Sequence, residues 1–203
     1  MPSIPLDTYT WTSLRDAALT EQPPLVATII HRGEVVMFVA ERTSAKTIFS
    51  LQLGLSVACG VPLAGLWDVP VKARVLYVAL EGSARWYQTQ LLRLTKMLGA
   101  EPDDSHWTLV RAPHMPLNRS AGAECLASLM AAHRPELLIL DPLYRIHHGT
   151  LTDDGEVAAT TGFINSLVMQ YGTAVWVPAH THRVRMDLMG KRIDEGSSAY
   201  FGS

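Results

Sequence analysis

The sequence has little cysteine and little net charge, and each shortage excludes a class of protein. Only two cysteines occur in 203 residues, Cys59 and Cys125, and neither has a partner at metal-ligand spacing. A disulfide scaffold would use more, so we expect both thiols to be reduced core residues of a cytoplasmic protein. The formal net charge of -2 argues against a surface that binds polyanions over its whole extent. Any contact with nucleic acid must therefore come from a local basic cluster.

Targeting and membrane segments are lacking as well. Met1–Thr20 has no basic flank followed by an apolar run, which argues against a signal peptide. The stretch 47–67 has no charged residue and is long enough to cross a bilayer. Gly60-Val61-Pro62 interrupts this stretch after about four helical turns. We therefore favour a helix buried inside a globular domain over a membrane span, and we expect no membrane partner.

Short apolar runs alternate with longer helical patterns along a chain that is 48% hydrophobic, which suffices for one substantial core. Strands are predicted at Val35–Val39, Val75–Leu80, Thr108–Val110, Leu137–Leu140 and Ala174–Val177. Helices are predicted at Lys46–Cys59, Arg85–Leu98, Ala121–His133 and Asp154–Tyr171. Several strands are apolar at consecutive positions, which is typical of strands covered on both faces. The alternation predicts an α/β domain with a mostly parallel sheet and helices on both faces.

In sheets of this kind, ligands bind at the carboxyl ends of the strands. The residues just after each predicted strand are therefore the candidates for a binding site. They are Ala40–Thr47, Glu81, Arg111, Asp141 and His180.

The first of these segments resembles a phosphate-binding loop. After the first predicted strand the chain reads Ala40-Glu41-Arg42-Thr43-Ser44-Ala45-Lys46-Thr47 and then enters an apolar helix. A P-loop has glycine, four residues, glycine, lysine, and then serine or threonine. Lys46 and Thr47 fit this pattern, but alanine stands at both glycine positions. On these residues alone, the simpler interpretation is a helix start with a surface lysine.

The two alanines are acceptable on conformational grounds. Glycine is needed where the backbone takes a positive φ or approaches a phosphate closely. Position 45 leads directly into the predicted helix and position 40 ends a strand, so we expect alanine to fit at both. The substitution is not neutral, because a methyl group must avoid the phosphate.

Three more polar residues follow strands in the order that one nucleotide site requires. Glu81 can orient and deprotonate the water that attacks a γ-phosphate, or it is a solvated loop residue. Asp141 ends an apolar run, as in a Walker B strand whose carboxylate holds Mg²⁺, or it is a simple polar strand exit. His180 can contact the γ-phosphate; a zinc site with His182 is the weaker alternative, because no further ligand stands at convincing spacing. The shared order favours a single nucleotide site.

Taken together, these segments resemble one family of nucleotide-dependent motors. The matching segments are Gly33-Glu34, Ala40–Thr47, Leu51–Leu63 with its Gly-x-Pro turn, Val75–Glu81, Leu138–Leu143, Pro178–His182 and Gly196–Ala199. In this order they are similar to the RepA-like branch of RecA-type ATPases, the group that contains plasmid-encoded hexameric replicative helicases. The resemblance covers about Ile29 to Ser203, nearly the whole chain.

The resemblance implies a RecA-like P-loop NTPase core that uses ATP and Mg²⁺. It implies a catalytic role for Lys46 on the phosphates, for Glu81 as the base and for His180 as the γ-phosphate sensor. It places Thr47 and Asp141 on the metal ion. The nucleotide-binding residues that it implies are Ala40, Glu41, Arg42, Thr43, Ser44, Ala45, Lys46, Thr47 and Ile48.

The resemblance also implies a ring-shaped homo-oligomer that binds ATP or ADP between subunits and moves on single-stranded DNA. Arg183, Arg185, Lys191 and Arg192 form a basic polar segment that is a candidate DNA-facing loop, and a solvated loop explains it equally well. We expect residues 1–28 to form an N-terminal arm or lead-in segment and 29–203 to form the core. Proteins of this group usually continue into further strands, which implies a core truncated at its C-terminal end.

The functional prediction is a Mg-dependent, helicase-like ATPase that acts on DNA during replication. The alternative is a degenerate nucleotide-binding or assembly module with little or no hydrolysis, because the loop has no glycine. A P-loop small-molecule kinase is a weaker third class, because the sequence shows no arginine-rich lid and no acceptor pocket, and fold alone does not determine function.

Overall fold

A five-stranded parallel sheet forms the centre of the domain in the computed structural model, which describes residues 8–17, 23–41, 44–146 and 154–180. The strands are β1 (Val35–Ala40), β2 (Val75–Ala79), β3 (Trp107–Arg111), β4 (Leu137–Asp141) and β5 (Ala174–His180). They lie in the order β1-β5-β4-β2-β3, and every pairing is parallel. Every predicted strand is present, and its bounds differ from the prediction by at most three residues.

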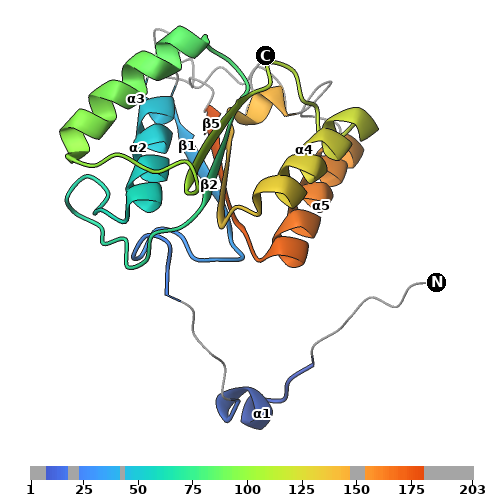
Figure 1. The fold of residues 1–203 in the computed structure, drawn as a ribbon. Coiled ribbons are helices and arrows are strands. Elements are labelled where there is room, and N and C mark those ends of the chain that lie inside the picture. The colour runs from blue at the N-terminus through green and yellow to red at the C-terminus, as the bar shows by residue number, and fades with distance from the viewer. Residues whose placement is uncertain (1–7, 18–22, 42–43, 147–153, 181–203) are drawn as a thin grey trace, which may run out of the picture.

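Helices cover both faces of this sheet. The long helices are α2 (Lys46–Cys59), α3 (Ala84–Leu98), α4 (Ser120–His133) and α5 (Asp154–Tyr171). Helices α2 and α3 lie together on one face, and α4 and α5 lie together on the other (Figure 1). The predicted α/β architecture with helices on both faces is confirmed. Two short elements complete it: the helix α1 (Trp11–Arg15), which lies away from the sheet in Figure 1, and the 3-10 helix η1 (Leu143–Arg145).

The helix bounds follow from local sequence. Ser83 caps α3, because its hydroxyl accepts a hydrogen bond from the backbone N–H of Trp86 at 3.2 Å. Gly60 and Gly99 end α2 and α3 in the left-handed conformation, at φ values of 69° and 66°. Along α3, Tyr87 and Leu94 are buried, as the predicted apolar stripe requires.

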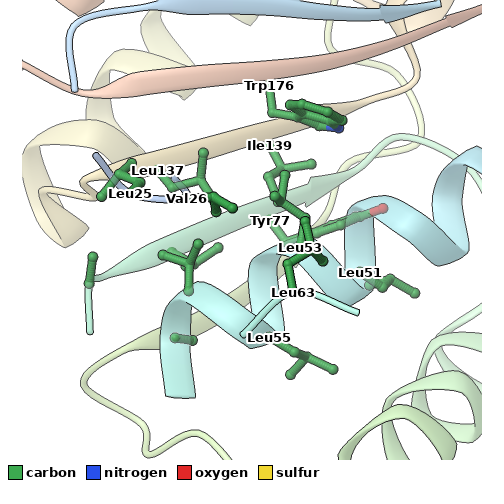
Figure 2. Packing of buried hydrophobic residues seen from close by; sticks show 14 of the residues in the cluster. Leu25, Val26, Leu51, Leu53, Leu55, Leu63, Tyr77, Leu137, Ile139 and Trp176 are labelled. Atoms are coloured by element: carbon green, nitrogen blue, oxygen red, sulfur yellow. The ribbon is translucent and has the colours of Figure 1, made fainter. Parts of the chain in front are cut away.

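The core has one half on each face of the sheet. On the α2 face, leucines of α2 pack against side chains from three adjacent strands (Figure 2). The residues that Figure 2 labels there are Leu25, Val26, Leu51, Leu53, Leu55, Leu63, Tyr77, Leu137, Ile139 and Trp176. On the other face, Leu126 and Met130 of α4 belong to the second half of the core. Strands β2 and β4 are buried at all five positions, as their continuous apolar runs predict.

Strand β1 differs from the central strands, because it lies at the edge of the described sheet. Val36 and Phe38 pack against the α2 half of the core. The alternate side chains Val35, Met37 and Val39 are between 43% and 49% exposed. The expectation that apolar strands are covered on both faces therefore does not extend to β1 within the described residues.

Residues before Ile29 contribute to the core as well. Leu25 and Val26 are completely buried, and the backbone N–H of Ala27 donates to the carbonyl of Asp68 at 2.8 Å. Helix α1 has no buried residue. The division of the chain into an arm at 1–28 and a core at 29–203 stays a prediction.

The cysteine prediction needs a correction. Cys59, at the end of α2, is half-buried, and burial raises the pKa of its thiol. Cys125 is exposed and is therefore not a core residue. The reason is its position on α4, whose buried residues Gly122, Leu126 and Met130 repeat every four positions and leave Cys125 off that stripe. No helix in the described ranges combines the length and apolar character of a membrane span.

Candidate functional site

The phosphate loop joins β1 to α2 at the carboxyl edge of the sheet. Lys46 is only 4% exposed, and its ammonium group folds back over the loop. Its Nζ donates to the carbonyl of Ala40 at 2.7 Å, to the carbonyl of Glu41, and to Oγ of Ser44 at 3.2 Å. The interpretation as a surface lysine is therefore wrong, because the loop wraps around the ammonium group.

The remaining described residues of the loop also lie around the ammonium group of Lys46 or at the start of α2. Oγ of Ser44 donates to the carbonyl of Glu41 at 2.6 Å, which closes the loop on itself. Ile48 lies in the first turn of α2 and packs partly against the core, so it can offer its backbone N–H to a phosphate but not its side chain. Arg42 and Thr43 lie outside the described residues.

Ala45 does not have the conformation that its position before the helix suggests. It is the N-cap of α2, with φ 58° and ψ 26° in the left-handed region. An alanine there costs about 1–2 kcal/mol, because its Cβ crowds the following carbonyl oxygen. The expectation that alanine fits at position 45 is therefore wrong, since the chain must turn through a left-handed residue to enter α2. Ala40 meets its expectation, because it is the last residue of β1.

Asp141 is the last residue of β4 and is 1% exposed. The hydroxyl of Tyr77, in the neighbouring strand β2, donates to its Oδ2 at 2.5 Å. The side chain of Thr47, in the first turn of α2, lies near enough to this carboxylate to lower its pKa. The structure thus brings together Thr47 and Asp141, the two residues expected on the metal ion.

The charges of the site influence one another. Burial raises the pKa of Asp141, and the hydroxyls of Tyr77 and Thr47 oppose that rise. The charge of Glu81 also raises it, whereas the charge of Lys46 lowers it. Burial lowers the pKa of Lys46, and the carboxylates of Asp141 and Glu41 oppose that change. A buried lysine and a buried carboxylate therefore stabilise each other's charged forms here.

Glu81 lies just beyond the end of β2 and is half-buried. Its Oε2 accepts a hydrogen bond from the hydroxyl of Tyr144, which belongs to η1 just after β4. On the other side, Nη2 of Arg111, the last residue of β3, donates to the carbonyl of Gly82 at 3.0 Å. The ends of β3, β2 and β4 therefore meet around Glu81.

His180 is the last residue of β5, and its backbone lies in register with Ala40 at the start of the loop. The side chain of His180 lies outside the described part of the structure. The same holds for His182 and for the basic segment with Arg183, Arg185, Lys191 and Arg192. Their expected roles as sensor and DNA-facing loop stay predictions.

Two tyrosines of the site were not predicted from the sequence. The sequence places Tyr77 only within an apolar strand, and Tyr144 follows directly after the Leu138–Leu143 segment with no predicted role. A signal for Tyr77 did exist: a tyrosine inside a strand that is buried on both faces must find a partner for its hydroxyl.

Other candidate sites in the described residues have fewer groups that could bind a metal ion or a phosphate. Within the described ranges, no three His, Cys, Asp or Glu side chains lie close enough together to hold a metal ion by themselves. A shallow groove of about 550 Å³ lies away from the strand ends and is lined by Gln52, Val61, Pro62, Ala64, Gly65, Met97 and Leu98. It has no charged lining residue, so the strand-end cluster is the better candidate for a phosphate ligand.

Comparisons with known proteins bear on the family and the fold of this chain. The family described as AAA domain matches residues 2–186. A search of curated proteins found no significant match. Among solved structures, a KaiC-like protein from the hyperthermophilic archaeon Pyrococcus horikoshii OT3 superposes with a TM-score of 0.51 at 15% identity. The match covers 77% of this chain and 65% of that chain, which is less than two thirds of its length.

At that identity the archaeal structure supports the fold alone, and it supports the α/β RecA-like P-loop core. The family match spans most of the chain and includes the loop, Glu81, Asp141 and His180. The chain therefore belongs to the AAA domain family.

Proposed function

We propose that this chain binds Mg·ATP at the carboxyl edge of its sheet and hydrolyses it. Family membership supports a nucleotide-binding, ATPase-type function in general. The observation that carries the specific proposal is the convergence of Lys46, Thr47 and Asp141. There a buried ammonium group and a threonine side chain from the start of α2 lie near a buried carboxylate from the end of β4.

The oxygen donors of the site fit Mg²⁺. Magnesium prefers hard oxygen ligands and is held in phosphate sites by few protein groups, with waters and phosphates completing its shell. Thr47 and Asp141 are such a pair, and the Thr47 side chain lies near enough to Asp141 to lower the pKa of its carboxylate. When bound, Mg²⁺ would supply positive charge that offsets the charge of the phosphates.

The loop residues supply the rest of the phosphate site. The ammonium group of Lys46 now rests on carbonyl oxygens and a hydroxyl, which are weaker partners than phosphate oxygens. The backbone N–H groups of Lys46, Thr47 and Ile48 lie in the first turn of α2 and form the positive end of that helix, which favours a bound anion. Lys46 would move from the carbonyls onto the outer phosphates.

Glu81 is the proposed base for hydrolysis. It would accept a proton from a water molecule while that water's oxygen bonds to the γ-phosphorus and the bond from the γ-phosphorus to the bridging oxygen breaks, releasing ADP. His180 would report on the γ-phosphate from the end of β5, because its backbone lies beside the start of the loop.

We further propose that hydrolysis drives movement on single-stranded DNA, within a homo-oligomeric ring that resembles the RepA-like helicases. The support is the sequence resemblance and the basic segment with Arg183, Arg185, Lys191 and Arg192. Phosphate contacts from such a segment would make DNA binding weaken as salt rises.

The test is release of phosphate from Mg·ATP by the purified chain, with and without single-stranded DNA. Glu81→Gln should lower turnover by about 100-fold or more, because a missing general base typically costs that much, and should preserve nucleotide binding. The control is Glu101→Gln, an exposed glutamate just beyond the other end of α3. Parallel loss of binding and turnover in Glu81→Gln would argue against the base. Turnover without any DNA effect would remove the motor and leave the ATPase.

One observation favours a second candidate, a nucleotide-binding or assembly module with little hydrolysis. Alanine occupies both glycine positions of the loop, and Ala45 is in the left-handed region. Its methyl group lies at the turn where the backbone must approach the phosphates. Saturable ATP or ADP binding without phosphate release, with and without DNA, would support this candidate over the ATPase.

A further inference from the structure

The hydrogen bond between Tyr144 and Glu81 joins two loops that leave neighbouring strands. Strands β2 and β4 pair in register, with Ala79 opposite Asp141. Just beyond this pair, the backbone N–H of Leu80 donates to the carbonyl of Asp141 at 2.9 Å. The chain segments that carry Glu81 and Tyr144 therefore start side by side at the same edge of the sheet.

The backbone on both sides of Glu81 is fixed, but its side chain is long. Leu80 is tied to β4, and Ser83 caps α3 after a left-handed turn at Gly82, φ 80°. The freedom that remains lies in the side-chain torsions of Glu81, which are costly to order. A general base works only when its carboxylate oxygen is within hydrogen-bond reach of the proton that it takes.

Tyr144 removes that freedom at one oxygen. Among the described residues, its hydroxyl is the one side-chain group that donates to Glu81, and it contacts Oε2. Oε1 accepts no hydrogen bond from a described residue, so it is the oxygen left for a water molecule. One oxygen is thus held by the protein, and the other has no hydrogen-bond partner among the described residues.

Tyr144 is itself held firmly. It lies in the middle of η1, where the N–H of Arg145 donates to the carbonyl of Pro142 and the N–H of Ile146 to that of Leu143, each at 3.1 Å. Ile146 is completely buried and anchors this turn.

The ring of Tyr144 also forms a cation–π contact. The guanidinium group of Arg145 lies over it, 5.1 Å from the centroid. Burial, followed by the hydrogen bond to Glu81, raises the pKa of Tyr144, which keeps its hydroxyl a donor.

We propose that Tyr144 is a positioning residue for the ATPase reaction: it holds Oε2 of Glu81 so that Oε1 can take the proton of the attacking water. This inference rests on the proposed function, because it assumes that Glu81 is the base. It assigns Tyr144 no contact with nucleotide or water. Its role differs from that of Tyr77, which donates to Asp141 on the metal side of the site.

The test is Tyr144→Phe, which keeps the ring and removes only the hydroxyl. We expect turnover to fall by about tenfold or more, since small losses of alignment at a reacting group have effects of this size. The dissociation constant for Mg·ATP should change by less than about twofold, because the phosphate contacts stay in place. Tyr171→Phe is the matched control, a half-buried tyrosine at the end of α5 before β5 begins, and it should leave both quantities unchanged.

A double-mutant cycle separates positioning from a general structural effect. In a Glu81→Gln background no base remains to be positioned, so Tyr144→Phe should cause no further loss of the residual single-turnover rate. A tenfold loss that persists in that background overturns the proposal, and so does unchanged turnover in Tyr144→Phe alone. A parallel rise of the dissociation constant also overturns it. Absence of turnover in the wild-type chain instead overturns the proposed ATPase, and this inference with it.

Discussion

The hydroxyl of Tyr77 donates a hydrogen bond to Oδ2 of Asp141 across the pair of strands β2 and β4, at 2.5 Å. Tyr77 is completely buried and Asp141 is 1% exposed, so this bond forms inside the protein. A buried carboxylate is costly unless donors satisfy its oxygens. Tyr77 therefore stabilises a carboxylate, the proposed metal ligand, at the end of an apolar strand.

Tyr77→Phe should destabilise the protein and raise the Mg²⁺ concentration that nucleotide binding requires. We expect a loss of about 1–3 kcal/mol in the free energy of unfolding, because an acceptor buried in the core loses its partner. Urea unfolding measures this, and a magnesium titration of nucleotide binding should show a higher midpoint. The control is Tyr87→Phe, a buried tyrosine of the same cluster whose hydroxyl makes no hydrogen bond with a described residue. Equal effects of both variants would remove the special role of Tyr77.

Ala45→Gly should stabilise the protein, although it replaces alanine by a more flexible residue. Relief of the left-handed strain is worth about 1–2 kcal/mol, and the extra freedom of glycine in the unfolded chain costs about 0.4–1 kcal/mol. We expect a net gain of about 0.5–1 kcal/mol in urea unfolding, together with tighter binding of Mg·ATP. Ala40→Gly, at the other glycine position, should instead be destabilising, because Ala40 ends a strand. Destabilisation by both variants would contradict the left-handed strain at Ala45.

Stability should decrease on acidification through Glu136. At the end of the sheet opposite the site, its Oε1 lies 2.9 Å from Nη2 of Arg32, and its Oε2 accepts from the backbone N–H of Arg74 at 3.1 Å. Burial raises the pKa of Glu136, but the bonds from Arg32 and Arg74 outweigh burial and leave it below the ordinary value of 4.5. A lowered pKa in the folded state adds stability above about pH 4.5, and this stability is lost as the pH falls through the folded-state pKa.

Urea unfolding of the wild type and Glu136→Gln at a series of pH values checks this. The difference between the two free energies should be largest near neutral pH and should shrink below about pH 4.5. Glu101→Gln is the control, since Glu101 is exposed and forms no ion pair within the described ranges. A difference that is independent of pH would contradict the assigned contacts.

The sequence predicted the elements of this fold well because each element depends on local periodicity. Helices α2 and α5 have the predicted bounds, and β2 and β4 are buried along their full length. The conformation of Ala45 was mispredicted because it depends on how the loop joins an edge strand to a helix. The direction in which the chain leaves β1 and enters α2 depends on how the sheet and the helix pack together, and the local sequence does not predict it.

The side-chain contacts of the site could not be predicted without the order of the strands in the sheet. Along the chain, β3 lies between β2 and β4, whereas in the sheet β4 is the direct neighbour of β2. The strand-end rule could therefore nominate Glu81 and Asp141. It could not pair Tyr77 with Asp141 or Tyr144 with Glu81, because both pairs cross from β2 to β4 or its following turn.

The most direct test of the account is a calorimetric titration of the chain with Mg·ATP, because its central claim is a working phosphate site without loop glycines. We predict saturable binding of one nucleotide per chain, weakened by about tenfold or more in Lys46→Ala, since charge-assisted contacts to phosphate are among the strongest hydrogen bonds. Lys96→Ala, at an exposed lysine of α3, should bind like the wild type. Absence of saturable binding, or binding that Lys46→Ala leaves unchanged, would contradict the account.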